Sequence, residues 1–443
     1  MIGKQRKLLP RFRLRRILGL VFALILSIKL LSACYNQPVK LSFVVTERES
    51  QYWRSLLKQF NDNNPNISIE IANFANKERK NPANSDDLRE IYVSAFKNQP
   101  PTYDLIYTDL IWVHEFAQNQ WIMDLSNEFS TNELEGFITS EVESGRYKGK
   151  LYRIPFRSDV GVLFYQKDLL EQLNLPEQLT FEQLIQISSE VKQKNKDITY
   201  GYLWQGKPSE GMTAMFVELL YSSGGFWIDE KHNVGLDKPE AIEAVEFLRN
   251  TITTGISPKD FMTYEEQKSR SLFRDGKVVF LRNWPDVWRD VNGSESPFPR
   301  NIAIKPVVRA DEGKESHACK GGWGFGIAKN TKHKEEALKA IKFLTSAAFQ
   351  QKFTLTYASV PSRKNLFYDP KIVAKYSYYP ELLEIVEKSR PRPAIPQYAE
   401  ASRILQKYLT KALNYNNNDY KQEMQAAAKE TEQLLSKTPN YQK

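Results

Sequence analysis

The sequence predicts an α/β protein with two lobes. Apolar runs of strand length, such as Leu41–Thr46 and Val278–Leu281, alternate along the chain with segments whose apolar residues recur at helical spacing. Without an N-terminal leader, described next, about 410 residues remain, which is more than one hydrophobic core ordinarily organises. No internal repeat or low-complexity linker interrupts the alternation.

Residues 1–33 have the layout of an export signal. They contain eight basic residues and no acidic one, and an apolar run over Ile17–Ile28 precedes Leu31-Ser32-Ala33-Cys34. This tetrapeptide resembles the bacterial lipobox, in which the cysteine is lipidated and becomes the first residue of the mature protein. The alternative is a retained transmembrane anchor, but a dozen apolar residues is short of the about 20 that span a bilayer. We therefore predict export, with lipid on Cys34 anchoring the protein to the outer face of the cytoplasmic membrane.

The positive charge of the chain lies mostly in this leader. The whole sequence carries a formal charge of +9, but the remainder has 54 basic residues against 53 acidic ones, which does not indicate nucleic-acid binding. Cys34 and Cys319 are the only cysteines, so no intramolecular disulfide is expected. The four histidines are scattered, and neither a metal site, a cofactor motif nor a catalytic motif is predicted.

The first elements alternate between strand and helix. After Leu41–Thr46 we expect a polar loop at Glu47–Ser50 and then a helix with Trp53, Leu57 and Phe60 on one face. The next expected elements are a strand at Ile67–Ile71, a helix through Leu88–Phe96 and a buried strand at Asp104–Tyr107.

Asp109 stands where that buried strand ends and a helix begins. The carboxyl ends of strands in open α/β sheets are where ligands bind, so this carboxylate is a candidate for binding. An N-cap of the following helix is the alternative, and one residue can do both.

The stretch Tyr152–Leu170 organises the centre of the chain. Extended residues around Pro155 lead into a β-rich run, Val160–Tyr165, and then into a helix at Lys167–Leu170. An aromatic residue, a cation and a carboxylate precede the run, at positions 156, 157 and 159. On these residues alone, a solvated strand entry and a binding site are equally compatible.

The remaining elements follow from periodicity and caps. Thr180–Gln183 is a capping box that opens a helix, and Met215, Phe216 and Leu219 recur at core spacing in another. The other expected elements are helices at Pro239–Asn250, Glu265–Asp275, Lys334–Thr345, Phe349–Phe353, Pro380–Ser389 and from Glu400 with a break at Asn414–Asp419, and strands at Val278–Leu281 and Ile302–Val308.

Two later segments combine aromatic and special backbone residues. Trp284 follows the strand Val278–Leu281 and stands next to Pro285. Gly321–Gly326 has four glycines in six residues, which lets a ligand approach the backbone closely, and Trp323 offers a flat face beside them. The glycine spacing fits no phosphate-binding fingerprint.

These pieces resemble the type-one extracellular solute-binding proteins, the receptors of ABC importers, and most of all their trehalose/maltose-binding branch. Seven segments carry the likeness in the family order: DLIYTDLIWVHEFAQNQWI (104–122), SDVGVLFYQKDLL (158–170), LWQGKPSEG (203–211), SSGGFW (222–227), FLRNWPDVW (280–288), GGWGFGIAKN (321–330) and RPRPAIPQYAEASRILQKYL (390–409).

The resemblance implies the type II periplasmic-binding-protein fold, in which two α/β lobes flank a ligand cleft and the chain crosses the hinge more than once. It assigns residues 34–155 and 307–347 to lobe 1, and residues 156–306 and 348–443 to lobe 2. Asp109 and Trp323 would then belong to the first lobe, Trp284 and Arg392 to the second, and Asp159 to the crossing.

The resemblance also implies roles for site residues. Glu49, Asp109 and Asp159 would accept hydrogen bonds from sugar hydroxyls, and Arg392 would donate to them. Trp284 and Trp323 would stack on pyranose faces, and Gly322 would offer its backbone. Arg157 stands where relatives often have an aromatic residue, which would suit a smaller or more polar ligand than an ordinary disaccharide.

The implied function is that of a monomeric, lipid-anchored receptor without enzymatic activity. It would deliver a disaccharide or glucoside, such as trehalose, maltose, sucrose or glucosylglycerol, to an ABC permease and its cytoplasmic ATPase. One alternative is a glycosidase with Asp109 and Asp159 as the carboxylate pair, which such enzymes hold about 5–10 Å apart. Another is a sensory or scaffold lipoprotein that feeds no importer.

Overall fold

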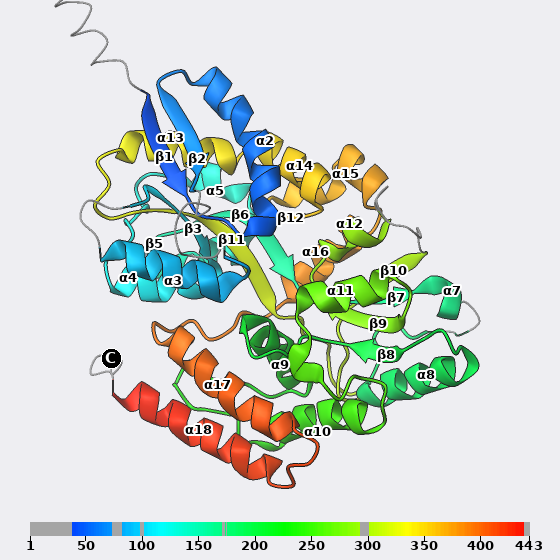
Figure 1. Ribbon diagram of the computed structural model, residues 1–443. Helices are drawn as coiled ribbons and strands as arrows, with labels where there is room; N and C mark the ends of the chain where they lie inside the picture. Colours follow the sequence, from blue (N-terminus) through cyan, green and yellow to red (C-terminus); the bar gives the residue numbers. More distant parts are fainter. Residues whose placement is uncertain are drawn as a thin grey trace, which may run out of the picture.

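The computed structural model describes residues 38–72, 82–97, 102–170, 173, 175–292 and 301–437. The predicted signal peptide and Cys34 lie outside these residues, so both stay predictions. The described chain forms the expected two α/β lobes, each with its own four-stranded sheet (Figure 1).

The sheet of the first lobe has the strand order β12-β6-β11-β3. The central strand β11 runs antiparallel to both of its neighbours, β6 and β3. A parallel pair, β1-β2, and a small hairpin, β4-β5, complete this lobe. The strands are β1 (Val39–Phe43), β2 (Ile67–Ile71), β3 (Leu105–Asp109), β4 (Arg146–Tyr147), β5 (Lys150–Leu151), β6 (Ile154–Val160), β11 (Lys320–Ile327) and β12 (Val360–Pro361).

Helices cover the first lobe around an aromatic core. Trp53 of α2 is fully buried, and its ring packs against Phe156 of β6 and Phe353 of α14. The helices are α2 (Glu47–Asn63), α3 (Ser85–Phe96), η1 (Leu110–Trp112), α4 (Val113–Gln118), α5 (Thr131–Glu135), α6 (Thr139–Glu143), α13 (Lys334–Leu344) and α14 (Ala347–Tyr357).

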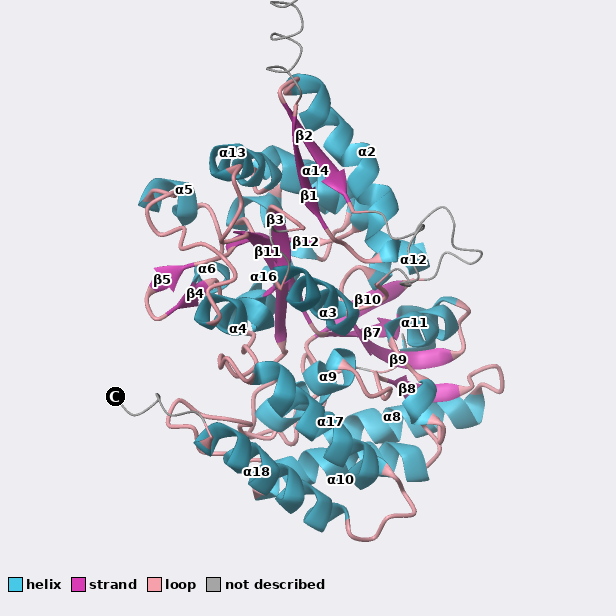
Figure 2. Cartoon of the chain, turned by 60° about the vertical axis from the view of Figure 1, so that its left-hand side comes forward, coloured by secondary structure: helices cyan, strands magenta, loops and turns pink. Residues whose placement is uncertain are grey.

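The sheet of the second lobe has the strand order β10-β7-β9-β8. Helices α10, α17 and α18 lie together at the far end of this lobe (Figure 2). The strands are β7 (Val162–Gln166), β8 (Tyr200–Leu203), β9 (Val278–Asn283) and β10 (Ile302–Lys305). The helices are α7 (Lys167–Leu170), α8 (Phe181–Lys194), α9 (Glu210–Ser222), α10 (Pro239–Thr253), η2 (Phe261–Thr263), α11 (Glu266–Arg274), α12 (Val287–Asn292), α17 (Tyr398–Leu413) and α18 (Tyr420–Ser436). Three further helices, η3 (Lys364–Tyr368), α15 (Pro370–Lys375) and α16 (Tyr379–Lys388), follow β12 of the first lobe, and the hydroxyl of Tyr379 in α16 donates to the carbonyl of Ser359 at 2.9 Å.

Most of the expected elements are present, although the strands expected at Leu41–Thr46 and Ile302–Val308 end earlier, at Phe43 and Lys305. The capping box at Thr180 is confirmed, with both of its reciprocal hydrogen bonds formed. The polar loop expected at Glu47–Ser50 is wrong, because these residues form the first turn of α2 with Thr46 as its N-cap. The β-rich run Val160–Tyr165 is divided at Gly161, where the chain passes from β6 of one sheet to β7 of the other.

The chain crosses between the lobes at three places that lie side by side. The first crossing is at Gly161, the second leads from β10 into β11, and the third follows α16. The amide of Gly161 donates to the carbonyl of Cys319 at 3.4 Å, and the amide of Lys320 donates to the carbonyl of Arg390 at 2.8 Å. These backbone contacts tie the three crossings into one hinge.

The lobe boundaries assigned to the sequence stay a prediction. Helix α14 and strand β12 lie in the range 348–443, which was assigned to lobe 2. However, α14 packs on α2 through Phe353 and Trp53, and Val360 of β12 pairs with Ser158 of β6. Because the third crossing follows α16, this packing favours a lobe 1 that extends to the end of α16 at Lys388.

Candidate functional site

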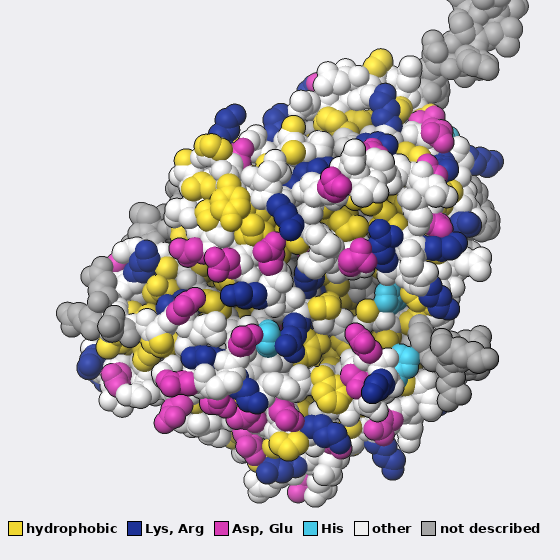
Figure 3. All heavy atoms as spheres, turned by 180° about the vertical axis from the view of Figure 1, so that it is seen from behind, with side chains coloured by type: hydrophobic (Ala, Val, Ile, Leu, Met, Phe, Trp, Pro, Cys, Tyr) yellow, Lys and Arg dark blue, Asp and Glu magenta, His cyan; other side chains and the backbone are white. Residues whose placement is uncertain are grey.

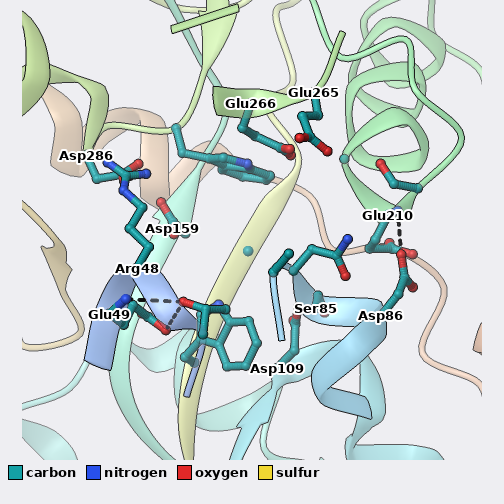
Figure 4. A pocket seen from close by; sticks show the side chains of 18 of the residues that line it. Arg48, Glu49, Ser85, Asp86, Asp109, Asp159, Glu210, Glu265, Glu266 and Asp286 are labelled. Atoms are coloured by element: carbon teal, nitrogen blue, oxygen red, sulfur yellow. Dashed lines mark hydrogen bonds and ion pairs between the residues drawn. The ribbon is translucent and has the colours of Figure 1, made fainter. Parts of the chain in front are cut away.

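A cavity of about 200 Å³ opens between the two lobes, and its walls come from both of them. The side chains drawn in Figure 4 surround it, with Asp286 and Arg48 close together on one side and Asp86 and Glu210 on the other. All eight ligand-binding residues predicted from the sequence line this one cavity: Glu49, Asp109, Arg157, Asp159, Trp284, Gly322, Trp323 and Arg392. Whether they bind a ligand stays a prediction.

Asp109 occupies the end of β3, as the sequence predicts, and it also caps η1. Its carboxylate accepts from the amide of Ile111 at 3.4 Å and from the hydroxyl of Ser85 at 2.9 Å. The guanidinium of Arg392 lies 3.8 Å from the same carboxylate. The side chain is therefore fixed at the cavity wall, where it is 7% exposed.

Arg157 lies between two of the predicted carboxylates. Its guanidinium donates to Asp159 at 2.6 Å and to the hydroxyl of Tyr107 at 3.0 Å, and it forms an ion pair with Glu49 at 3.2 Å. All three of its nitrogens are thus engaged by the protein. Arg157 orients Glu49 and Asp159 and partly neutralises them.

Burial raises the pKa of Asp159 to about 7. The guanidinium of Arg157 opposes this shift, whereas the neighbouring charges of Asp286, Asp109 and Glu49 add to it. The carboxyl group consequently sits in a region where negative charge is only partly compensated.

Trp323 stands on the central strand of the first sheet, beside a glycine that the packing requires. Its ring stacks on Tyr107 at 4.9 Å between centroids and meets Trp112 edge to face. A β carbon at Gly322 would lie 2.8 Å from a carboxylate oxygen of Glu141, and the backbone there has a φ of +155°. Gly322 therefore lets β11 lie close to its neighbours at the cavity wall.

Trp284 follows β9 and brings an aromatic ring from the second lobe into the cavity wall. The guanidinium of Arg282 lies over this ring at 4.4 Å from its centroid. A β carbon at Gly321 would lie 3.4 Å from the ring, so Trp284 of the second lobe lies close to the backbone of β11 in the first. Two tryptophans, one from each lobe, thus line one cavity.

Arg392 contacts both lobes from the third crossing. It pairs with Glu210 of α9 and lies near Asp109 of β3. The side chain is only 3% exposed, yet its Nε atom has no hydrogen-bond partner among the residues that the structure describes. Burial raises the pKa of Glu210 to about 7, against the opposing charge of Arg392.

Several residues of the cavity were not singled out from the sequence. Glu210 lies within the family-like segment 203–211 and Asp286 within 280–288, so the resemblance could have pointed to both. The amide of Glu210 donates to Asp86 at 3.1 Å across the lobes. The other charged and aromatic residues that were missed are Arg48, Glu265, Glu266, Arg270 and Tyr357.

The described residues show no sign of a metal site or a membrane span. They contain no cluster of histidine, cysteine and carboxylate side chains suited to a metal ion. Within the same ranges, no helix combines the length and the apolar character needed to cross a bilayer. Cys319 is a buried free thiol. On the face opposite to that of Figure 1, acidic and basic side chains are interspersed (Figure 3).

Two α/β lobes around a cavity lined from both sides define a ligand-binding protein of the hinged, two-lobed class. The chain belongs to the bacterial extracellular solute-binding proteins, whose family model matches residues 45–351. A probable ABC transporter-binding protein of Deinococcus radiodurans is 26% identical over 319 residues, which is 71% of this chain and 75% of that protein. A maltotriose-binding protein of Pyrococcus abyssi is 25% identical over 59% of this chain and 55% of its own length.

Solved structures share the fold over almost the whole described chain. Maltose-bound MalE3 of T. maritima superposes with a TM-score of 0.81 at 31% identity, covering 89% of this chain and 100% of that protein. A ribitol complex from Agrobacterium radiobacter superposes with a TM-score of 0.78 at 22% identity, covering 90% of this chain and 100% of that one.

Proposed function

We propose that this protein is the substrate-binding lipoprotein of an ABC sugar importer. It captures a disaccharide or glucoside of the trehalose, maltose, sucrose or glucosylglycerol type in the cavity between its lobes and delivers it to the membrane permease. The observation that carries the proposal is that Trp323 of one lobe and Trp284 of the other line the same carboxylate-rich cavity.

The chemistry of the cavity suits a sugar. A pyranose has an apolar C–H face and a rim of hydroxyl groups, so its site needs flat aromatic surfaces beside planar polar groups. Trp284 and Trp323 supply the surfaces. Asp109 and Arg392 supply an acceptor and a donor, and hydrogen bonds to such charged groups contribute about 1.5–3 kcal/mol each.

The relatives support a sugar or polyol as cargo. MalE3 is a maltose complex, and the Pyrococcus relative is a maltotriose-binding protein. A relative from Pseudomonas aeruginosa, 22% identical over 66% of this chain and 66% of its own length, is a mannitol-binding protein. Arg157, whose three guanidinium nitrogens contact Glu49, Asp159 and Tyr107, makes this part of the cavity wall polar, which favours the smaller and more polar candidate, glucosylglycerol.

A thermal-shift panel tests the proposal. A ligand that binds only the folded state raises its stability by RT ln(1 + [L]/Kd), which is about 2.7 kcal/mol at one hundred times Kd. We expect one of trehalose, maltose, sucrose and glucosylglycerol to raise the melting temperature by several degrees at millimolar concentration. The proposal fails if none of them does so.

The remaining partners are part of the same proposal. The mature chain would be a monomer, held by lipid on Cys34 and docked on permease subunits that are served by a cytoplasmic ATPase. Replacing Cys34 with alanine should release the protein from the membrane fraction. A sensor that feeds no importer would bind the same sugar, but uptake of the sugar would not depend on the protein.

We propose no enzymatic activity. Asp159 has the raised pKa that a general acid needs, but its carboxylate is held by Arg157 at 2.6 Å. A receptor closes on its ligand and releases it unchanged. Incubation with an aryl glycoside should therefore release no phenol, whereas steady release that is lost in Asp159→Asn would establish a glycosidase.

A further inference from the structure

A buried ion pair joins Glu218 of α9 to Arg282 of β9 beside the hinge. Both side chains are 1% exposed. The guanidinium donates through Nε at 2.7 Å and Nη2 at 2.5 Å to the two carboxylate oxygens of Glu218, and through Nη1 at 2.9 Å to the side-chain oxygen of Gln205. The pair is therefore held in one geometry by two parallel hydrogen bonds and a third at its edge.

The same pair contacts two of the three crossings between the lobes. Glu218 Oε1 accepts from the amide of Cys319, at the second crossing, at 3.2 Å. At the first crossing, a β carbon on Gly161 would lie 1.7 Å from Glu218 Oε1 and 2.7 Å from Arg282 Nη2. Only a residue without a side chain allows the crossing strand to lie directly against the pair.

The pair also supports the aromatic ring that the second lobe contributes to the cavity. Arg282 lies 4.4 Å from the ring centroid of Trp284, two residues further along the same segment. A cation over the face of an aromatic ring is attracted by the ring, and the ion pair to Glu218 fixes where this guanidinium lies. The orientation of Trp284 thus depends on groups that also touch the hinge.

We propose that Glu218 and Arg282 are positioning residues that couple Trp284 to the hinge. Glu218 and Arg282 set the orientation of Trp284 and hold the crossing backbone at Gly161 and Cys319, so ligand stacking and lobe closure depend on each other. This proposal rests on the proposed function, because it assigns Trp284 a ligand. The stability of the fold does not by itself explain this buried ion pair, since the free energy needed to desolvate two charges is about as large as that gained from their attraction.

A double-mutant cycle on affinity tests the coupling. We expect Glu218→Gln to weaken binding of the tightest sugar by roughly tenfold. The proposal attributes this loss of affinity to a change in the orientation of the Trp284 ring. Glu218→Gln should therefore weaken binding far less in a protein that already carries Trp284→Ala. Additive losses in the double variant would overturn the proposal. The control is Leu248→Ala, a fully buried change in α10 that should lower the melting temperature without changing affinity.

Arg282→Lys provides a second variant that keeps the charge. A lysine cannot donate the two parallel hydrogen bonds to Glu218 or stack as a plane on Trp284. The emission of Trp284, measured as the difference from the matching Trp284→Ala protein, should therefore shift in this variant as it does in Glu218→Gln. An unchanged emission difference in both variants would contradict the positioning role.

A readout without ligand separates this proposal from the proposed function. Spin labels at the exposed positions Lys339→Cys in α13 and Gln186→Cys in α8 report the distance between the lobes. We expect Glu218→Gln to broaden the distance distribution of the ligand-free protein, and an unchanged distribution would overturn the hinge role. If no sugar binds the unmodified protein, the proposed function fails while this measurement still decides the hinge role.

Discussion

The guanidinium of Arg48 lies 3.0 Å from the carboxylate of Asp286, so the first turn of α2 in one lobe is ion-paired to the segment after β9 in the other. Arg48 also reaches Asp290 at 2.9 Å, and Arg270 holds both aspartates from α11. Burial alone would raise the pKa of Asp286, but Arg270 and Arg48 hold it well below its usual range. The charges between the lobes are thus matched at this edge of the cavity.

Removal of this contact should weaken ligand binding. Arg48→Ala removes two partly exposed ion pairs but leaves Asp286 and Asp290 paired with Arg270, so we expect a cost of about 1 kcal/mol or roughly a fivefold loss of affinity. Affinity should also fall with added salt, and less so in the variant. Titrations at low and high salt measure both effects. Lys58→Ala removes an exposed pair within the same helix and should change neither.

The two tryptophans of the cavity should contribute unequally to stability but similarly to affinity. Trp284→Ala and Trp323→Ala should each cost about 1–3 kcal/mol of binding, or roughly 5- to 150-fold in Kd. Trp323 is 8% exposed and packed on Tyr107, so its replacement should also lower the melting temperature. Trp121→Phe lies outside the cavity lining and should preserve affinity. Unchanged affinity in both alanine variants would remove the aromatic surfaces from the site.

The stability of the protein should depend on the protonation of Asp159. Burial raises the pKa of its carboxyl from the ordinary value of 3.8, which holds in the unfolded chain, to about 7 in the folded protein. Between these values the folded state binds a proton that the unfolded state has lost, so this group makes the free energy of unfolding fall as the pH rises. Asp159→Asn should therefore lose less stability between about pH 5 and about pH 8. Thermal unfolding across this window measures the difference, and parallel curves would contradict the raised pKa.

Gly322 should not tolerate a side chain. A β carbon there would lie 2.8 Å from Glu141 and 3.1 Å from the carbonyl of Arg157, at a φ that suits glycine. We expect Gly322→Ala to lower the free energy of unfolding by about 1–3 kcal/mol. Gly149→Ala is the matched control, because Gly149 has a φ of +77° and open space around it. Denaturant unfolding of both variants separates the clash from the backbone strain, and equal losses would show that the clash contributes nothing.

Local patterns and the family resemblance were enough to predict most of the fold and eight of the residues that line the cavity. Asp109 and Trp284 were found because each follows a buried strand, where ligands bind in such sheets. Glu49 was placed in a loop, since its polar neighbours hid the start of α2 at the Thr46 cap. Thr46 is recognised as the N-cap only when the helix that contains Trp53 is extended back toward the N-terminus.

The residues that were missed owe their role to distant partners. Arg48 contacts Asp286, and Asp86 contacts the amide of Glu210, and the partners in each pair are more than a hundred residues apart in the sequence. No local periodicity encodes such pairs, because they form only when the two lobes meet. Local sequence patterns therefore identify strand ends and aromatic surfaces more readily than they identify contacts between lobes.

Calorimetric titration with trehalose, maltose, sucrose, glucosylglycerol, glucose and spermidine tests the central claim most directly, with tryptophan fluorescence followed in parallel. We expect one glucoside to bind with micromolar affinity or better and to change the fluorescence, and we expect Trp284→Ala to lose that change. If no sugar gives a heat of binding, or if spermidine alone binds, the result would contradict a sugar receptor and would mean that this cavity serves a different solute.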